Sequence, residues 1–300
     1  MEYVQGLTIV IPVHNRAHIV RRTLASVEAQ TLRPLRVVLV DNASTDNSLE
    51  ILRSWAKAPH GLDVTVVEEC RPGSTAARNR GLKEVKTEWT MFFDSDDTMR
   101  PNHCERALSY SNDADMVGWN VCMHMPYGRT SIKRFYCGDA QFHSLFHGST
   151  ATQRYMARTS LFRRAGLWNE KIKYWNDIEL GARLLALKPR IRHAGKQISV
   201  DVFFQKESIT GTSYSMRTKD AEAALKSIGH TLGEEKELWI DTKHAILAAD
   251  CTREGSPEGR KILDAILLRH NGARRILLKS VYHFRRFGGR GVARLIRPLL

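Results

Sequence analysis

Three carboxylates stand close together at the end of an apolar run in this sequence. The run at 91–93 leads into Asp94, Ser95, Asp96 and Asp97. In open parallel sheets ligands bind beyond the carboxyl ends of the strands, and carboxylates separated by one residue can share a hard divalent cation that bridges substrate phosphates. The pattern therefore predicts a metal-diphosphate site with Asp94 and Asp96 as ligands. For an isolated Asp-x-Asp, the alternative is an acidic turn that simply ends a strand.

A second acid, Asp41, stands at the end of another apolar run and is followed by a polar turn. By the same strand-end rule, Asp41 could accept hydrogen bonds from a nucleotide base or ribose. The same pocket could be lined by the residues at the end of the first apolar run, which are Pro12, Val13, His14 and Asn15. The alternative is ordinary helix capping by Ser44 or Asp46, and it is compatible with the first interpretation.

A parallel sheet is needed to bring these turns together, and the pattern before residue 122 predicts one. Short apolar runs alternate there with longer amphipathic ones, as in successive strand-helix units of an α/β fold. The expected strands are 7–13, 36–40, 64–67, 89–93 and 115–119. The expected helices are 17–29, 46–58, 74–85 and 101–111, the second of them capped by Ser44.

The rest of the chain divides at about residue 214. Turn signals at Pro126, Gly128 and Gly138 predict a hairpin or loop over the sheet between 123 and 147. A helix is expected at 176–187, followed by short strands around Ile191 and Val200. Beyond residue 214 the pattern is helical only. We therefore expect a catalytic domain over 1–213, with a nucleotide-binding half at about 1–121 and an acceptor half at about 122–213, and a helical, basic region over 214–300.

The charge balance indicates anionic partners. The net charge is +14, and no acidic residue follows Asp264, while basic side chains alternate there with apolar ones. Such basic amphipathic helices suit an anionic membrane surface, although a solvated helical face or a subunit contact is the alternative. The five cysteines are scattered and odd in number, which indicates reduced thiols. Without a signal peptide or an apolar span, the expected location is cytoplasmic, with peripheral contact to the membrane face.

Several segments resemble the family-2 glycosyltransferases, which have the GT-A fold. Four of them stand in the family's order and at its usual spacing, at 8–15, 38–46, 73–81 and 92–97. A fifth, 165–170 leading into 176–183, is similar to the family's acceptor-side segment with its catalytic acid. The resemblance covers roughly 7–213. It implies a GT-A fold with a mostly parallel, Rossmann-like sheet flanked by helices, and the transfer of a sugar from a nucleotide diphosphate donor, most often a UDP-sugar.

The resemblance also implies roles for individual residues. Asp41 would contact the nucleotide base, Asp94 and Asp96 would hold Mn²⁺ or Mg²⁺ with the diphosphate, and Asp177 would be the catalytic base. The nucleotide-binding set implied in this way is Pro12, Val13, Asn15, Asp41, Arg78, Asp94 and Ser95. Asp177 opens the helix at 176–187, where the helix dipole favours an ionised carboxylate. The reaction would be a direct displacement that inverts the sugar configuration, without a covalent intermediate.

The sequence departs from the family pattern at three positions. His14 stands where the family usually has tyrosine, Asn176 where an acid commonly precedes the base, and Lys206 close to where a histidine often approaches the diphosphate. The transmembrane helices and the Gln-x-x-Arg-Trp signature of processive relatives are not found in the sequence. We therefore expect a non-processive enzyme that acts on a glycan or lipid-linked saccharide in cell-surface polysaccharide or lipopolysaccharide biosynthesis.

Three other protein classes are alternatives to this interpretation. A nucleic-acid-binding protein would explain the basic charge but not the acids at 94–97, which repel a phosphate backbone, so no nucleic acid is expected as a partner. A Rossmann oxidoreductase would need a glycine-rich turn after the first strand, where this chain has Pro12 to Arg16. A sugar nucleotidyltransferase shares a related fold but should also show a glycine-rich turn with a basic residue there, and it remains the alternative enzyme.

Overall fold

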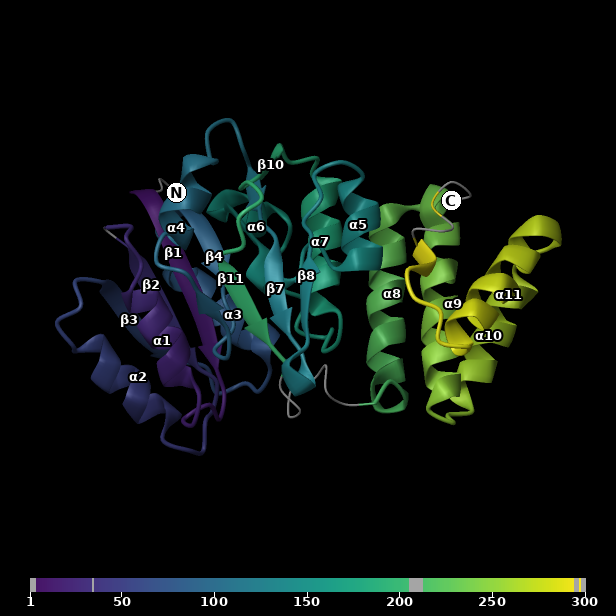
Figure 1. Cartoon of the computed structure of the whole chain (residues 1–300), viewed down its shortest axis with the longest axis horizontal. Helices are drawn as coiled ribbons and strands as arrows, with labels where there is room; N and C mark the ends of the chain where they lie inside the picture. Colours follow the sequence, from purple (N-terminus) through teal and green to yellow (C-terminus); the bar gives the residue numbers. More distant parts are fainter. Residues whose placement is uncertain (1–3, 34, 205–212, 294–296, 298–300) are drawn as a thin grey trace.

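A central mixed sheet organises the computed structural model, which describes residues 4–33, 35–204, 213–293 and 297 (Figure 1). Its strands are β1 Val4–Val13, β2 Arg36–Asp41, β3 Asp63–Glu68, β4 Thr87–Phe92, β6 Met116–Gly118, β9 Tyr155–Arg158 and β10 Ile191–His193. They lie in the order β10-β6-β9-β4-β1-β2-β3. β9 is antiparallel to β4 and β6, and the other pairings are parallel. The predicted mostly parallel sheet is therefore confirmed.

Helices cover both faces of this sheet. One face packs against α1 Val20–Glu28, α2 Ser48–Ala56 and α4 His103–Ser109, and the other against α3 Ser74–Glu84, α6 Thr159–Arg164 and α7 Asn176–Ala186. The alternation along β1 divides the core, because Ile9 and Ile11 join the first face and Val10 the second. Gly81 brings α3 close to the sheet, since a Cβ at this position would lie 2.4 Å from a methyl carbon of Val10.

A second, smaller sheet stands beside the first. It has the order β5-β11-β7-β8. Its strands are β5 Thr98–Met99, β7 Val121–His124, β8 Thr130–Lys133 and β11 Val200–Phe203. β7 and β8 form an antiparallel pair, so the predicted hairpin is present, but 140–147 is helical (α5, Ala140–His147) where the sequence suggested only an irregular segment.

The C-terminal helices pack against the α/β part through a shared core. They are α8 Thr218–Leu232, α9 Glu237–Arg253, α10 Glu258–Leu268 and α11 Gly272–Arg286. Leu145 of α5 and Ile178 of α7 belong to the same buried cluster as Leu225 and Leu247. Figure 1 shows these helices side by side at one end of the molecule, next to α5 and α7. Among the described helices, none has both the length and the apolar character that crossing a membrane requires.

Some predicted helix ends are wrong by a few residues. α1 begins at Val20 rather than 17, and α4 spans only His103–Ser109 rather than 101–111. The prediction that Ser44 caps the second helix is also wrong, because α2 begins at Ser48 and the Ser44 hydroxyl accepts a hydrogen bond from the Asn15 amide instead. Asp46 does accept the Ser48 amide at 3.0 Å, which fits the capping alternative for that residue.

Candidate active site

The polar turns after β1 and β2 are joined by hydrogen bonds. The Asn15 side-chain oxygen accepts the Thr45 amide at 2.8 Å, and the Asn15 amide donates to Ser44 Oγ at 3.1 Å. Asp41 Oδ2 accepts the Ser44 amide at 3.1 Å. The adjacent positions of β1 and β2 in the sheet explain this arrangement, because parallel neighbours end at the same edge. Asn15 and Asp41 therefore line one corner of the strand-end surface.

Asp41 is buried and retains one unused acceptor. Its residue exposure is 3%, and no described group donates to its Oδ1 atom. A buried carboxylate oxygen without a donor is costly, and a ligand N–H or O–H would satisfy it. Two other residues of the predicted set support this edge rather than face it. Pro12 pairs with Val40 in the sheet, and Val13 has its side chain in the core and its carbonyl bonded to the Asn42 amide.

Asp94 is held in place by two side chains. Arg78 forms an ion pair with its Oδ1 at 2.8 Å, and Gln153 donates to its Oδ2. The Arg78 guanidinium is itself buried and lies 4.5 Å from the ring centroid of Trp168. This arginine comes from α3, while Asp94 follows β4. The helix packed on the sheet therefore orients the first acid of the cluster.

Asp96 and Asp97 differ in their surroundings. Partial burial, together with the charge of Asp94, raises the pKa of Asp96 to about 6. Apart from its own amide, no described residue donates a hydrogen bond to the Asp96 carboxylate. Asp97 is 1% exposed and accepts the Phe203 amide of β11 at 2.9 Å, and burial raises its pKa well above the usual range. Asp97 thus joins the two sheets, whereas Asp96 remains available to a ligand. Ser95, between Asp94 and Asp96, is buried.

Asp177 lies in the first turn of α7. Although it is distant from Asp94 in the sequence, the two carboxyl groups interact electrostatically. Arg78 Nη1 is 3.5 Å from the side-chain oxygen of Asn176, and the charges of both Arg78 and Asp94 act on the Asp177 carboxyl. The prediction that the helix dipole favours its ionised form is wrong on balance. Desolvation raises the pKa of Asp177 despite the hydrogen bond that the Ile178 amide donates to it at 2.9 Å.

The structure thus brings Asp94, Asp96, Arg78 and Asp177 into one charge-coupled group. Arg16, which follows Asn15, also acts on the pKa of Asp96 and connects this group to the corner formed by Asn15 and Asp41. The position expected for Lys206 lies outside the described residues. Such an array can hold a cation through carboxylate oxygens and still keep one carboxyl group of raised pKa for proton transfer.

Sequence reasoning missed several residues that complete this site. Gln153 contacts Asp94 from a short helix, η2 Thr152–Arg154, about sixty residues further along the chain. Asn79 exchanges two hydrogen bonds of 2.9 Å with the backbone of Trp168, which fixes the Trp168 ring beside Arg78. Asn79 lies in the segment 73–81 that resembles the family, so the sequence could have indicated its role. Nothing in the sequence around Gln153 indicates a contact with Asp94.

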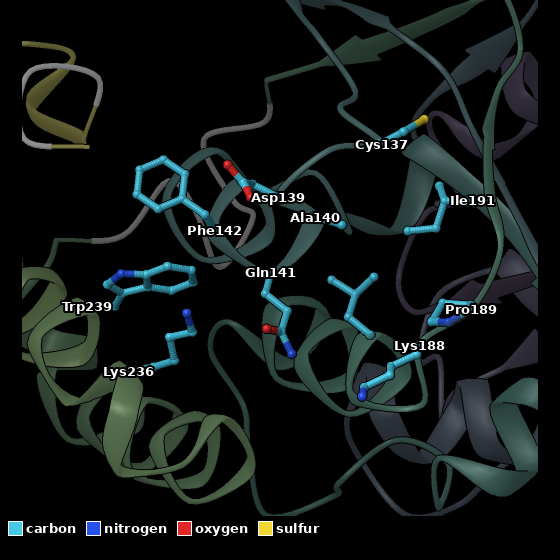
Figure 2. Close-up of a pocket in the computed structure, with 11 residues that line it drawn as sticks. Cys137, Asp139, Ala140, Gln141, Phe142, Lys188, Pro189, Ile191, Lys236 and Trp239 are labelled. Atoms are coloured by element: carbon cyan, nitrogen blue, oxygen red, sulfur yellow. The ribbon is translucent and has the colours of Figure 1, made fainter. Parts of the chain in front are cut away.

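An open hollow lies away from the carboxyl ends of the strands. It has a volume of about 300 Å³ and is bordered by α5, the end of α7 and the start of α9. Figure 2 shows Lys236, Trp239, Phe142 and Gln141 around it. Elsewhere among the described residues, two groups of side chains have ligand atoms within 4.8 Å of one another. One consists of Cys122, His124 and Asp201, and the other of Glu237, Asp241 and His270. Neither group includes Asp94, Asp96, Arg78 or Asp177.

Comparison with known proteins identifies relatives of this chain. The family described as Glycosyl transferase family 2 matches residues 8–167, more than half of the 300 residues. The sequence is 32% identical to glycosyltransferase AglE of Haloferax volcanii over 133 residues, which are 43% of this chain and 43% of that protein. It is 26% identical to the uncharacterized glycosyltransferase RT0329 of Rickettsia typhi over 248 residues, 78% of this chain and 70% of that protein. The match to AglE therefore spans less than half of that relative.

Solved structures share the fold at low sequence identity. S. aureus TarS 1–349 in complex with UDP-GlcNAc superposes with a TM-score of 0.64 at 15% identity, covering 98% of this chain and 92% of that one. The match to a longer TarS chain covers 55% of it. The mannosyltransferase PcManGT from Pyrobaculum calidifontis, in complex with GDP-Man and Mn²⁺, has a TM-score of 0.58 at 16% identity, with 99% and 88% coverage. The predicted GT-A fold with a C-terminal helical region is confirmed.

Proposed function

Because the chain belongs to glycosyl transferase family 2, we propose that it transfers a sugar from a nucleoside diphosphate donor, a UDP-sugar in the first instance, to a hydroxyl group of a glycan or lipid-linked saccharide. The observation that carries the proposal is the charge-coupled group of Asp94, Asp96, Arg78 and Asp177 at the strand ends. Binding of UDP-GlcNAc by TarS and of GDP-Man by PcManGT supports a nucleotide-sugar donor.

The nucleotide binds at the corner formed by Asn15 and Asp41. The unused Oδ1 of Asp41 accepts a hydrogen bond from the base, which removes the cost of its burial. Pro12 and Val13 hold the end of β1 in position, and Arg78 and Ser95 border the diphosphate next to Asp94.

A divalent cation, Mn²⁺ or Mg²⁺, fits the residues present. Among the described residues, only its own amide donates to the Asp96 carboxylate, and the charge of Asp94 adds to the cost of ionising it. Carboxylate oxygens are the ligands that these hard cations prefer, so Asp94 and Asp96 would hold the ion. When bound, it neutralises charge on the departing nucleoside diphosphate. The complex of PcManGT with Mn²⁺ supports this part of the proposal.

Asp177 is the general base. Its raised pKa suits a carboxylate that takes a proton from the acceptor hydroxyl, because proton transfer is most efficient when the pKa of the base approaches the working pH. The acceptor oxygen then attacks the anomeric carbon directly, and the sugar configuration inverts. No nucleophile of the protein takes part, and the enzyme adds one sugar, or very few, per encounter.

The C-terminal region rests on an anionic membrane surface. Large apolar side chains on α10, on α11 and directly after α11 face solvent, with Leu268 83%, Ile276 66% and Phe287 81% exposed. Exposed basic residues such as Arg274 and Lys279 lie beside them. A helix that presents apolar and basic side chains together binds at the interface of an acidic bilayer. Residues 1–213 then form the catalytic domain and 214–300 its membrane contact, which suits a lipid-linked acceptor in cell-surface polysaccharide biosynthesis.

The test is a panel of UDP-, GDP- and dTDP-sugars, offered to the purified protein with Mn²⁺ and without an acceptor. Donor hydrolysis and thermal stabilisation are recorded for the wild type and for Asp96→Ala. We expect a metal-dependent response to one donor that the variant loses. A matched control is Asp63→Ala. It removes an exposed carboxylate from the first residue of β3, at the edge of the sheet opposite the carboxyl ends of the strands. A response that is equal in wild type and Asp96→Ala would contradict the proposal.

A further inference from the structure

Two cations of the C-terminal region lie over consecutive aromatic rings that directly precede α7. The guanidinium of Arg217 is 4.5 Å from the ring centroid of Tyr174, and Lys243 Nζ is 4.7 Å from that of Trp175. The two rings stack on each other at 4.9 Å. Asp177 follows two residues later. The helical region therefore reaches the immediate surroundings of the proposed base.

Lys243 has no carboxylate partner within the part of the chain that the structure describes. It is partly exposed, and among the residues that the structure describes none forms a hydrogen bond or ion pair with its ammonium group. Its neighbour Asp250 is already occupied, since Arg285 donates to both carboxylate oxygens at 2.8 and 3.0 Å. Desolvation lowers the pKa of Lys243 to about 8, although the charges of Asp250 and Asp177 act in the opposite direction. The ammonium group therefore lacks the counterion that a half-buried cation needs.

A second cation without a carboxylate lies nearby. Arg154 is buried and donates to the backbone carbonyls of His147 and Gly148 at 3.0 and 2.6 Å. Its pKa is lowered to about 10 by desolvation and is sensitive to the charge of Asp177. Desolvation and the charges of His143 and Lys243 lower the pKa of His147 to about 4, so this imidazole adds no charge at neutral pH. Around Asp177, positive charge thus exceeds negative charge on the side of the helical region.

This surplus lies on the side from which an acceptor would approach. The charges that act on Asp177 from the donor side are those of Arg78 and Asp94, whereas Lys243 belongs to α9 and is coupled to Asp250 and Arg285 of the C-terminal helices. In a direct displacement the nucleophile enters opposite the leaving diphosphate. A group bound by Lys243 would therefore belong to the acceptor and not to the donor.

We propose that the acceptor carries a phosphate group close to the accepting sugar, and that Lys243 binds this phosphate. The inference rests on the transfer reaction proposed above and names the class of its acceptor. A phosphate supplies the missing counterion, because it accepts charge-assisted hydrogen bonds from an ammonium group. The phosphate can come from a lipid diphosphate carrier or from a soluble phosphorylated glycan.

The experiment uses donor hydrolysis as a readout that needs no acceptor. Methyl phosphate is added as a probe, with glycerol as its uncharged counterpart and with excess Mg²⁺ to prevent metal depletion. We expect methyl phosphate to inhibit hydrolysis without competing with the donor, and glycerol to have no effect. In Lys243→Met the inhibition constant of methyl phosphate, relative to that of UDP, should rise roughly tenfold, as for the loss of one charged hydrogen bond. Lys243→Arg should recover most of the inhibition.

The control is Lys261→Met, which makes the same chemical change on α10, where Lys261 is exposed and pairs with Glu258. It should behave as the wild type. Farnesyl diphosphate and glycerol 3-phosphate then distinguish the sources, because a lipid carrier predicts stronger inhibition by the first and a soluble glycan by the second. Binding of methyl phosphate is followed in parallel by phosphorus NMR. The site is therefore tested even if the protein neither hydrolyses a donor nor is stabilised by one, which is the result that would refute the proposed reaction. Inhibition that competes with the donor, or that Lys243→Met leaves unchanged, overturns the inference.

Discussion

Replacing Asp96 with asparagine should make the metal-free protein more stable, although it removes a proposed metal ligand. Desolvation and the charge of Asp94 raise the pKa of Asp96 from 3.8 to about 6. A carboxyl whose pKa is raised by folding costs stability wherever it is ionised, and the cost disappears as the pH falls towards the pKa of the unfolded chain. The difference between the two pKa values corresponds to about 3 kcal/mol near pH 8, and to about half of that near pH 5.

Urea unfolding in EDTA measures this effect. The free energy of unfolding of Asp96→Asn should exceed that of the wild type by up to about 3 kcal/mol near pH 8, and by less near pH 5. Added Mg²⁺ should stabilise the wild type and leave the variant unaffected, because the ion relieves the same repulsion. If the variant is instead less stable than the wild type near pH 8 without metal, then desolvation and the charge of Asp94 do not destabilise the ionised Asp96 as described.

A control of opposite sign is available at Asp46. Although desolvation acts in the other direction, hydrogen bonds from Ser48 and Ala17 lower the pKa of Asp46. A carboxyl with a lowered pKa contributes stability at neutral pH that is lost in acid. Asp46→Asn should therefore be less stable than the wild type near pH 8, and the difference should shrink as the pH falls. Both variants remove one negative charge, so only the surroundings of the carboxylate distinguish them.

Three further outcomes are expected. Asp177→Asn should lower kcat by roughly 10²–10⁴ while calorimetric titration with UDP shows unchanged binding, and near-normal turnover would exclude it as the base. Gly81→Ala should reduce the free energy of unfolding by about 1–3 kcal/mol, because its Cβ would lie 2.4 Å from a methyl carbon of Val10, and an unchanged urea midpoint would contradict this packing. Phe287→Glu should weaken co-sedimentation with anionic vesicles roughly tenfold, whereas equal sedimentation would argue against membrane contact.

Much of the fold could be predicted because strand and helix alternate locally in the first half of the chain. The segments that form β1, β2 and β4 are the continuous apolar runs expected of strands covered on both faces. The position of the polar residues after them followed from the parallel arrangement of these strands. β9 could not be predicted in this way. Its four residues, Tyr155–Arg158, are too short to show a period, and their place between β4 and β6 depends on pairing with strands far away in the sequence.

The site was predictable only where its residues stand in motifs. Asp41, Asp94 and Asp177 were named from their positions after strands or at a helix start. Gln153 and Lys243 were not, because each reaches the site through tertiary packing and nothing in its neighbourhood in the sequence indicates a ligand. The direction of the pKa of Asp177 was missed for the same physical reason, since desolvation depends on the elements packed around a helix end and the dipole does not.

The placement of β9 also determines the order in which this sheet can assemble. β4 and β6 are not paired with each other, and both depend on a strand that is synthesised after the hairpin of β7 and β8 and after α5. Until Tyr155–Arg158 leaves the ribosome, β4 is an unpaired edge with its hydrogen-bonding groups exposed. The strand-helix units from β1 to β4 can form early through local contacts. Addition of β9 to the edge of β4 comes later, because the long segment between these two strands has to be ordered first. A nascent chain halted before β9 would therefore expose a sheet edge that invites aggregation, and helices α6 and α7, with Asp177, can pack only after that edge is covered.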